Sequence, residues 1–156
     1  MKIAIGSDHR GFALKEDLKP YLQAEGYEVL DVGASHLDPA DDYPDYAYAA
    51  SMLVASGEAD RAVLVCGSGA GMVIAANKVA GIRAVESQTV EHIVAARHDD
   101  DANVLALGSE EVDQDMAREI AVAFLTTSYA GEERHERRLD EISQIEQNEG
   151  KEREYE

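Results

Sequence analysis

The sequence predicts a single α/β domain with a Rossmann-like, three-layer fold around a five-stranded parallel sheet. Short apolar runs alternate along the chain with segments whose apolar residues recur at helical spacing, which is the pattern of a parallel sheet with crossover helices. Glycine closes several of these segments. The chain has 156 residues, 45% of them hydrophobic, which suits one hydrophobic core rather than two.

The first half of the chain contains two expected strand–helix pairs. The apolar run KIAIGSD predicts a strand at 2–8, and the helical spacing that follows predicts a helix over 11–26 that ends at a glycine. The next run, YEVLDVG, predicts a strand at 27–33. A polar loop, ASHLDPADDYP, then leads into a helix expected over 45–57.

The middle of the chain continues the alternation. The run RAVLVCG predicts a strand at 61–67, and AGMVIAANKVA predicts a helix over 70–80. The segment IRAVES predicts a strand at 82–87, followed by a helix over about 88–98. These elements bring the expected strands to four.

The last part of the chain contains the fifth strand and two helices. The run ANVLALG predicts a strand at 102–108, and a helix is expected over about 112–128. A charged helix over 132–147 completes the expected domain, 1–147, and 148–156 is expected to be a frayed acidic tail. Three apolar residues of the charged helix share one face: Leu139, Ile142 and Ile145.

The charge and the distribution of apolar residues exclude two classes of function. With 14 Lys and Arg against 32 Asp and Glu, the net charge of −18 argues against binding the phosphate backbone of nucleic acids. No run approaches the roughly 18 apolar residues of a membrane span, and the start of the chain enters a strand rather than a signal peptide. A cytoplasmic protein is therefore expected, with an acidic surface that reflects either solubility or a salty cytoplasm.

The glycine-rich loop CGSGAG is the most informative motif. In an open parallel sheet, ligands bind beyond the carboxyl ends of the strands, and we expect GSDHRGF, CGSGAG and RHDDDAN to lie there. The glycine loop lacks the Lys-Ser/Thr of a Walker loop, and Met72 replaces the third glycine of a dinucleotide fingerprint. Its backbone N–H groups could instead hold an anion. Cys66, at the start of this loop, is either a buried small hydrophobic residue or a reactive thiol.

Five motifs together identify a family. The segments GSDHRGFALK, DYPDYA, CGSGAGMVIAANKVAGIRA, NVLALGS and ERHERR resemble the type B ribose-5-phosphate isomerases and the related galactose-6-phosphate isomerase subunits over residues 1–147. The resemblance implies an enzyme that opens a sugar ring and moves a proton between C1 and C2 through a cis-enediolate, without metal or cofactor. Ribose 5-phosphate and ribulose 5-phosphate are the expected substrates. Galactose 6-phosphate, allose 6-phosphate, a tetrose 4-phosphate and a non-catalytic sugar-phosphate sensor are alternatives.

The resemblance also implies roles for individual residues. Cys66 is the expected base, the loop amides hold the enediolate oxygen, and Ser68 is either a neighbour of the thiol or a plain loop residue. Some members of the family instead use a glutamate at the position of Met72 and lack the cysteine. The expected substrate-binding residues are Asp8, His9, Tyr43, Gly67, Gly69, Ala70, Gly71, Asn103, Arg134 and Arg138. Asp8 could instead cap the first helix, and the two arginines could instead form salt bridges along the last helix.

The chain departs from the family before the fifth strand, where members carry a histidine and then an asparagine. Counting back without a gap from NVLALG places Asp99 at the position of the histidine and Asp100 at that of the asparagine, with His98 one residue early. Either His98 reaches the site and opens the sugar ring, or Asp99 does so. As a proton donor, Asp99 would need a pKa raised by burial or by repulsion from Asp100 and Asp101.

The resemblance implies an assembly as well. Members of the family form dimers in which the loop before the fifth strand completes the partner's active site, and some dimers pair into tetramers. We therefore expect a homodimer with shared active sites, possible further pairing to a homotetramer, and the apolar face of 132–147 exchanged or packed at the dimer interface.

Overall fold

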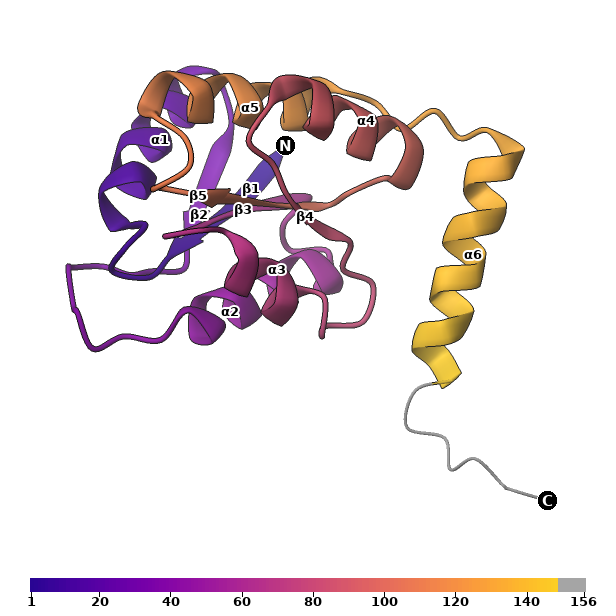
Figure 1. The fold of residues 1–156 in the computed structure, drawn as a ribbon, viewed down its shortest axis with the longest axis horizontal. Coiled ribbons are helices and arrows are strands. Elements are labelled where there is room, and N and C mark those ends of the chain that lie inside the picture. Colours follow the sequence, from indigo (N-terminus) through magenta and orange to yellow (C-terminus); the bar gives the residue numbers. More distant parts are fainter. Residues whose placement is uncertain (149–156) are drawn as a thin grey trace.

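The computed structural model describes residues 1–148, so the expected tail lies outside the described residues apart from Asn148. Five parallel strands form one sheet in the order β2-β1-β3-β5-β4 (Figure 1). The strands are β1 (Lys2–Ser7), β2 (Glu28–Asp31), β3 (Arg61–Cys66), β4 (Ala84–Glu86) and β5 (Val104–Gly108). The helices are α1 (Phe12–Ala24), α2 (Tyr43–Ser56), α3 (Ala70–Ala76), α4 (Val90–Asp100), α5 (Gln114–Thr126) and α6 (Glu133–Asn148).

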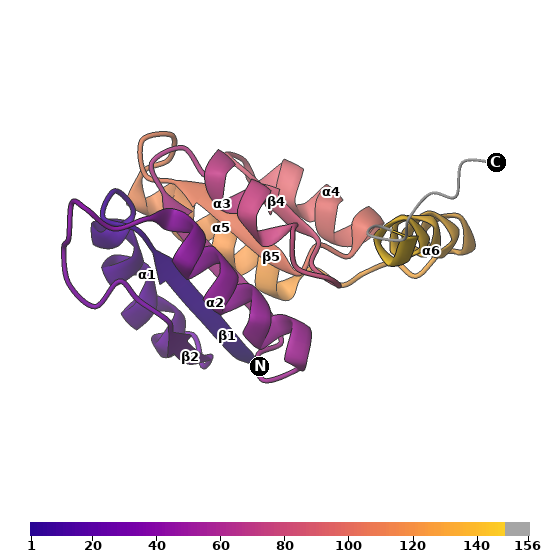
Figure 2. The same cartoon turned by 90° about the horizontal axis from the view of Figure 1, so that it is seen from below.

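Helices cover both faces of the sheet, so the predicted three-layer α/β fold is confirmed. One apolar cluster joins the sheet to α1, α4 and α5, and a second joins it to α2 and α3 (Figures 1 and 2). Successive strand side chains point to opposite faces. In β3, Val63 and Val65 therefore belong to the first cluster, whereas Leu64 and Cys66 belong to the second.

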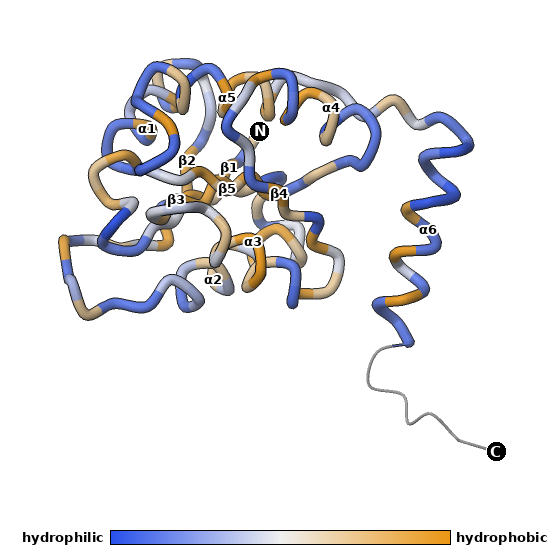
Figure 3. The backbone as a smooth tube through the Cα atoms, in the orientation of Figure 1, coloured by the Kyte–Doolittle hydropathy of each residue, from blue (hydrophilic) through white to orange (hydrophobic). Residues whose placement is uncertain are grey.

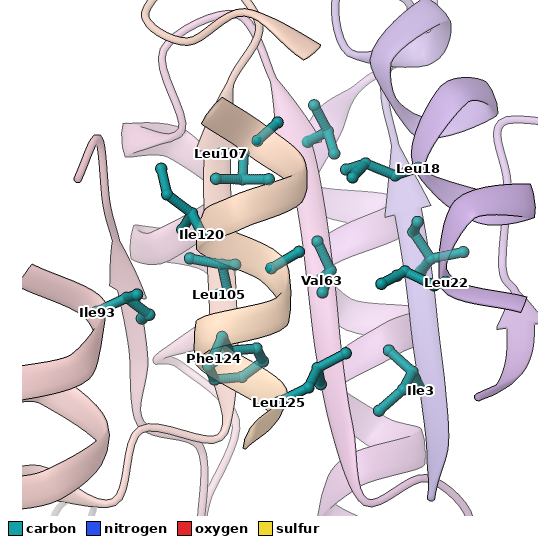
Figure 4. Packing of buried hydrophobic residues seen from close by; sticks show 14 of the residues in the cluster. Ile3, Leu18, Leu22, Val63, Ile93, Leu105, Leu107, Ile120, Phe124 and Leu125 are labelled. Atoms are coloured by element: carbon teal, nitrogen blue, oxygen red, sulfur yellow. The ribbon is translucent and has the colours of Figure 1, made fainter. Parts of the chain in front are cut away.

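The larger cluster fixes the sheet against α1 and α5. Phe124 and Ile120 of α5 and Leu18 of α1 are fully buried on β1, β3 and β5 (Figure 4). Burying a side chain of this size contributes about 1.5–3 kcal/mol. The central strand β3 is buried from its second residue to its last, so its carboxyl end is held rigidly.

Several helix boundaries differ from those expected, and two differences matter for function. The helix expected over 70–80 ends at Ala76, because the side-chain amide of Asn77 exchanges hydrogen bonds with the backbone of Ala84 (2.8 and 3.0 Å). The helix expected over 88–98 starts at Val90 and continues to Asp100, behind a cap formed by the Thr89 hydroxyl. Residues 98–100 of the expected loop are therefore helical, and only 101–103 connect α4 to β5.

A buried lysine secures the loop that flanks the end of β1. The ammonium group of Lys15 is fully buried and donates to the Asp31 carboxylate (3.0 Å) and the Ala34 carbonyl (2.5 Å). Burial by itself raises the pKa of Asp31, but hydrogen bonds from the Gly33 N–H and the neighbouring lysines outweigh it and hold this pKa below its usual value. The Gly33 carbonyl accepts from the Ser7 N–H at 2.8 Å, so the loop is tied to the end of β1.

Helix α6 stands apart from the three layers (Figures 1 and 2). Apolar residues recur along it between charged ones, and Ile142 and Ile145 are 50% and 62% exposed (Figure 3). The Glu146 carboxylate of this helix accepts from the Gly81 N–H at 3.0 Å. Neither α6 nor any other helix within residues 1–148 is long and apolar enough to cross a membrane.

Candidate active site

The thiol of Cys66 lies at the carboxyl end of β3, at the entrance to the glycine loop. Its side chain is 5% exposed, and its sulfur accepts a hydrogen bond from the Gly69 N–H at 3.1 Å. Gly69 precedes α3 with a φ of 82°, a left-handed conformation that favours glycine. The turn therefore aims a backbone N–H at the atom that carries negative charge in a thiolate.

Two further residues of the predicted site, Ser68 and Tyr43, lie at the glycine loop. The Ser68 hydroxyl is exposed and accepts from the Ala70 N–H at 3.3 Å. It forms no hydrogen bond with the Cys66 sulfur, so within the described residues Ser68 acts as a loop residue. The ring of Tyr43 lies against the loop, because a Cβ added at Gly71 would be 2.6 Å from that ring. Tyr43 therefore lies beside the glycine loop, and its role as a wall of the site stays a prediction.

The segment after β1 packs directly on the end of β3. A Cβ added at Gly11 would lie 2.2 Å from the Val65 carbonyl oxygen and 2.9 Å from the Cys66 nitrogen, so only glycine permits this approach. Asp8 is buried and accepts from the Gly11 N–H at 3.0 Å. Gly11 itself is the N-cap of α1, so Asp8 orders the turn before the helix rather than capping it.

His9 is held by a residue that the sequence did not single out. The Asp41 carboxylate accepts from the His9 backbone N–H (3.0 Å) and contacts ring atom Nδ1 (2.7 Å). The Tyr46 hydroxyl donates to the same carboxylate at 3.2 Å. Burial alone raises the pKa of Asp41, but these bonds lower it overall, so the carboxylate is ionised and orients the imidazole. The sequence signal that could have revealed this contact is the acidic loop before α2.

Arg10 is a second functional candidate that sequence reasoning missed. A Cβ added at Gly67 would lie 2.2 Å from the Arg10 guanidinium carbon, so the cation lies over the glycine loop. It forms an ion pair with Glu110, beyond β5, whose hydrogen bond raises the pKa of Arg10. The sequence signal for Arg10 was its position in the motif GSDHRGF, which was expected to lie at the site. This cation lies beside the backbone donors that could bind an anion.

The remaining predicted residues form a separate cluster at the other end of the sheet. His98 and Asp99 lie in the last turn of α4, which leads into the amino end of β5, and His135 lies in the first turn of α6. The expectation that RHDDDAN lies beyond the carboxyl ends was wrong, because a segment that precedes a parallel strand meets its amino end. A single chain therefore brings Asp8, His9 and Cys66 together but leaves this cluster apart.

The expected rise in the pKa of Asp99 was also wrong. Asp99 Oδ1 lies 2.7 Å from His98 Nδ1 and 3.7 Å from His135 Nε2. The His98 hydrogen bond, followed by the charges of His135, His98 and nearby Arg134, lowers the pKa of Asp99 despite some desolvation. Two imidazoles rather than neighbouring carboxylates face the group, so Asp99 is ionised near neutral pH and is unsuited to donate a proton.

Three other predicted residues lie near this cluster. Arg134 and Arg138 are exposed on α6, and Arg134 Nε pairs with Glu132 at 3.1 Å. Arg138 forms no ion pair with any residue between 1 and 148, which leaves its guanidinium available to a ligand. Asn103 is different, because its side chain bonds the Arg83 N–H (2.7 Å) and the Gly81 carbonyl (2.9 Å). It orders the turn before β4, and both ends of its amide are already used.

Comparisons with known proteins extend this description. The family described as ribose/galactose isomerase matches residues 3–142. Ribose-5-phosphate isomerase B of Escherichia coli K12 is 44% identical over 146 residues, which cover 94% of this chain and 97% of that protein. D-erythrulose-4-phosphate isomerase 2 of Mycolicibacterium smegmatis is 43% identical over 127 residues, covering 80% of this chain and 84% of that protein. The structure of ribose-5-phosphate isomerase B from Clostridium thermocellum matches with a TM-score of 0.91 at 42% identity, covering 95% of this chain and 99% of that one.

The chain belongs to the ribose/galactose isomerase family, as its motifs predicted. Its relatives and structural neighbours are sugar-phosphate isomerases, so the protein is an enzyme of that class. The alternative of a non-catalytic sensor is set aside on the same grounds.

The contact between Gly69 and the Cys66 sulfur can be tested with two alanine variants. Gly69→Ala and Gly57→Ala both force a φ near 80° on a residue with a side chain, at a cost of about 1–2 kcal/mol. Only the former brings a Cβ to 2.7 Å from the Glu86 side chain, whereas Gly57 has open space. Alanine keeps the backbone N–H, so we expect Gly69→Ala to act by moving that N–H away from the sulfur and to lower kcat by about 10²-fold, the scale for losing one preorganised donor, while Gly57→Ala leaves kcat near wild type. Equal kcat values in the two variants, measured beside urea unfolding, would contradict this role.

Proposed function

We propose that the enzyme interconverts ribose 5-phosphate and ribulose 5-phosphate through a cis-enediolate, with the Cys66 thiolate as the base. The observation that carries the proposal is the hydrogen bond from the Gly69 N–H to the sulfur at 3.1 Å, at the entrance to a loop of backbone donors. The thiolate removes the proton from C2 of the open aldose and returns it to C1. The loop amides stabilise the charge that develops on the enediolate oxygen.

The surroundings of Cys66 support this assignment of the base. The position at which some members carry a glutamate is Met72, which is fully buried in the core and has no proton to transfer. His9, oriented by Asp41, and buried Asp8 lie on the neighbouring segment, where they can hydrogen-bond sugar hydroxyls. Arg10 places a positive charge over the loop, on the side where an anionic intermediate would form.

We infer that a dimer completes the site. Cys66 ends β3 beside the carboxyl end of β5, whereas Asp99 precedes the amino end of β5. Five residues of strand separate these ends by about 13 Å at roughly 3.3 Å per residue. A cavity of about 730 Å³ between α6 and the body, lined partly by Ile82, Ile142 and Ile145, offers an apolar surface to a second subunit. The partner's cluster would then supply the groups that Cys66 lacks within one chain.

His98 is the better candidate for opening the sugar ring. Its Nδ1 faces the Asp99 carboxylate at 2.7 Å, which orients the ring and leaves Nε2 free for the substrate. Asp99 is ionised, so its role is to position the imidazole. Arg134 and Arg138 lie on the adjoining α6, where they can bind the substrate's phosphate.

The identity of the sugar separates the proposal from its alternatives. The relative from Mycolicibacterium smegmatis is named for a four-carbon sugar phosphate, which makes a tetrose 4-phosphate the second candidate. We expect the highest kcat/KM for ribose 5-phosphate, at least tenfold above erythrose 4-phosphate, galactose 6-phosphate and allose 6-phosphate, since a missing or additional carbon typically costs 10- to 200-fold. The assay follows aldose–ketose conversion of all four. A higher kcat/KM for another sugar would refute the substrate while leaving the enzyme class intact.

The role of the thiol is tested by Cys66→Ala. We expect kcat to fall by about 10²–10⁴-fold, the usual contribution of a general base. The affinity for ribose 5-phosphate, measured by calorimetry, should change only a few-fold, because the phosphate contacts do not involve sulfur. Substantial turnover by Cys66→Ala would refute the assignment of the base. A parallel loss of binding would indicate that the thiol shapes the pocket instead.

The shared site is tested by mixing two defective subunits. Cys66→Ala lacks the base, and the double variant Arg134→Ala/Arg138→Ala lacks the phosphate contacts, each worth about 1.5–3 kcal/mol. A mixed dimer contains one intact site if the two sets come from different subunits. After unfolding and refolding an equal mixture, we expect kcat/KM to recover to about a quarter of wild type. The controls are each variant refolded alone. If the mixture recovers no more activity than the controls, Cys66 and the two arginines act in a site formed by one subunit.

A further inference from the structure

We propose that His98, Asp99 and His135 form a binding site for a divalent transition-metal ion such as Zn²⁺. The three side chains each offer one ligand atom, and these atoms lie within 4.8 Å of one another. Two imidazoles and one carboxylate suit Zn²⁺ and Co²⁺, whereas Mg²⁺ and Ca²⁺ prefer oxygen ligands. The proposed isomerase chemistry does not require this site.

The spacing of the ligand atoms suits a small ion. Zn²⁺ lies about 2.0–2.1 Å from its nitrogen and oxygen ligands, which places neighbouring ligands of a tetrahedron about 3.3 Å apart. The observed separations are 2.7 Å between His98 Nδ1 and Asp99 Oδ1 and 3.7 Å between His135 Nε2 and Asp99 Oδ1. These two distances lie on either side of the required value, and all three ligand atoms lie within 4.8 Å of one another, so side-chain movements would have to draw the two imidazoles closer around an ion.

The buried imidazole of His135 presents its Nε2 atom to the proposed ligand set. This imidazole is 4% exposed, yet its Nδ1 forms no hydrogen bond within the described chain. The edge of the ring that faces Asp99 is Nε2, so an ion in this cluster would bind Nε2 and leave Nδ1 as it is. The only acidic group within ion-pair distance of its Nε2 in residues 1–148 is Asp99, at a separation too long for a hydrogen bond. A metal ion between them would replace this weak contact with two coordinate bonds.

The two remaining ligands leave room for exchange with solvent. The side chains of His98 and Asp99 are 50% and 49% exposed, so water can enter and occupy a fourth position. Three protein ligands and an open position are typical of reactive or regulatory zinc sites rather than closed structural ones. The ion would also link α4 to α6, the helix that otherwise stands apart from the body. If the proposed function is correct, bound metal would take His98 Nδ1 and the Asp99 carboxylate that orients the ring, and would inhibit the isomerase by disturbing that orientation.

Metal binding is measured directly on untagged protein. We expect one Zn²⁺ per chain by calorimetry, visible d–d absorption on adding Co²⁺, and a rise in Tm of about 5–10 °C at 100-fold Zn²⁺ excess over the Kd. His98→Ala removes an exposed ligand. It should weaken Zn²⁺ binding by more than 10- to 100-fold, which is the typical cost of losing only a hydrogen-bond partner of a ligand. His135→Ala should do the same, and circular dichroism checks its fold. The matched control is His92→Ala, an exposed histidine of the same helix, which should bind as wild type.

Two results would overturn the site: no binding of either ion by the wild-type protein, or undiminished binding by His98→Ala. The Cys66→Ala variant separates this inference from the proposed function. It should bind Zn²⁺ as wild type even though it lacks the proposed base, since the three ligands come from one chain. Loss of Zn²⁺ binding in Cys66→Ala would assign the ion to the thiol and refute the site. Metal binding by an otherwise active Cys66→Ala would refute the proposed base alone.

Discussion

The close approach of two backbone segments at the carboxyl end of β3 is the constraint on which the site depends. Gly11 lies so near β3 that a side chain there would overlap the Val65 carbonyl. The Cys66 and Gly67 carbonyls are in turn bonded by the N–H groups of Ser109 and Glu110, at 2.8 and 3.0 Å. The loops after β1, β3 and β5 therefore form one continuous edge. Within it, the direction of the Gly69 N–H toward the sulfur is set by backbone packing rather than by flexible side chains.

The same parallel topology separates the functional residues into two groups. Loops that follow strands gather at one edge of the sheet, and segments that precede strands gather at the other. Cys66 and His9 belong to the first edge, whereas His98 and the arginines of α6 belong to the second. The proposed chemistry uses both groups, so the proposal requires that two chains associate. The exposed apolar face of α6 lies beside the second group, where such a meeting would cover it.

Electrostatics inside the second group reverse the conclusion drawn from local sequence. Three consecutive aspartates predict mutual repulsion, but a helix directs successive side chains to different sides. Asp101 pairs with Arg83 and Arg97, and Asp99 faces His98 and His135. Two of the three carboxylates thus have their own cationic or imidazole partners. Spacing along the chain could not reveal this, since His135 comes from a helix that begins more than 30 residues later.

The sequence by itself determined the strands, the layered α/β class, the family and the position of Cys66 at the end of a strand before a glycine turn. These features depend on local apolar periodicity and on glycine, which act over a few residues. The tertiary structure alone decided that Asp41 orients His9, that Arg10 covers the loop, and that Asn103 orders a turn. It also decided which end of the sheet each group occupies. Such contacts join residues distant in sequence, so they depend on how the layers pack and leave no periodic signal in the chain.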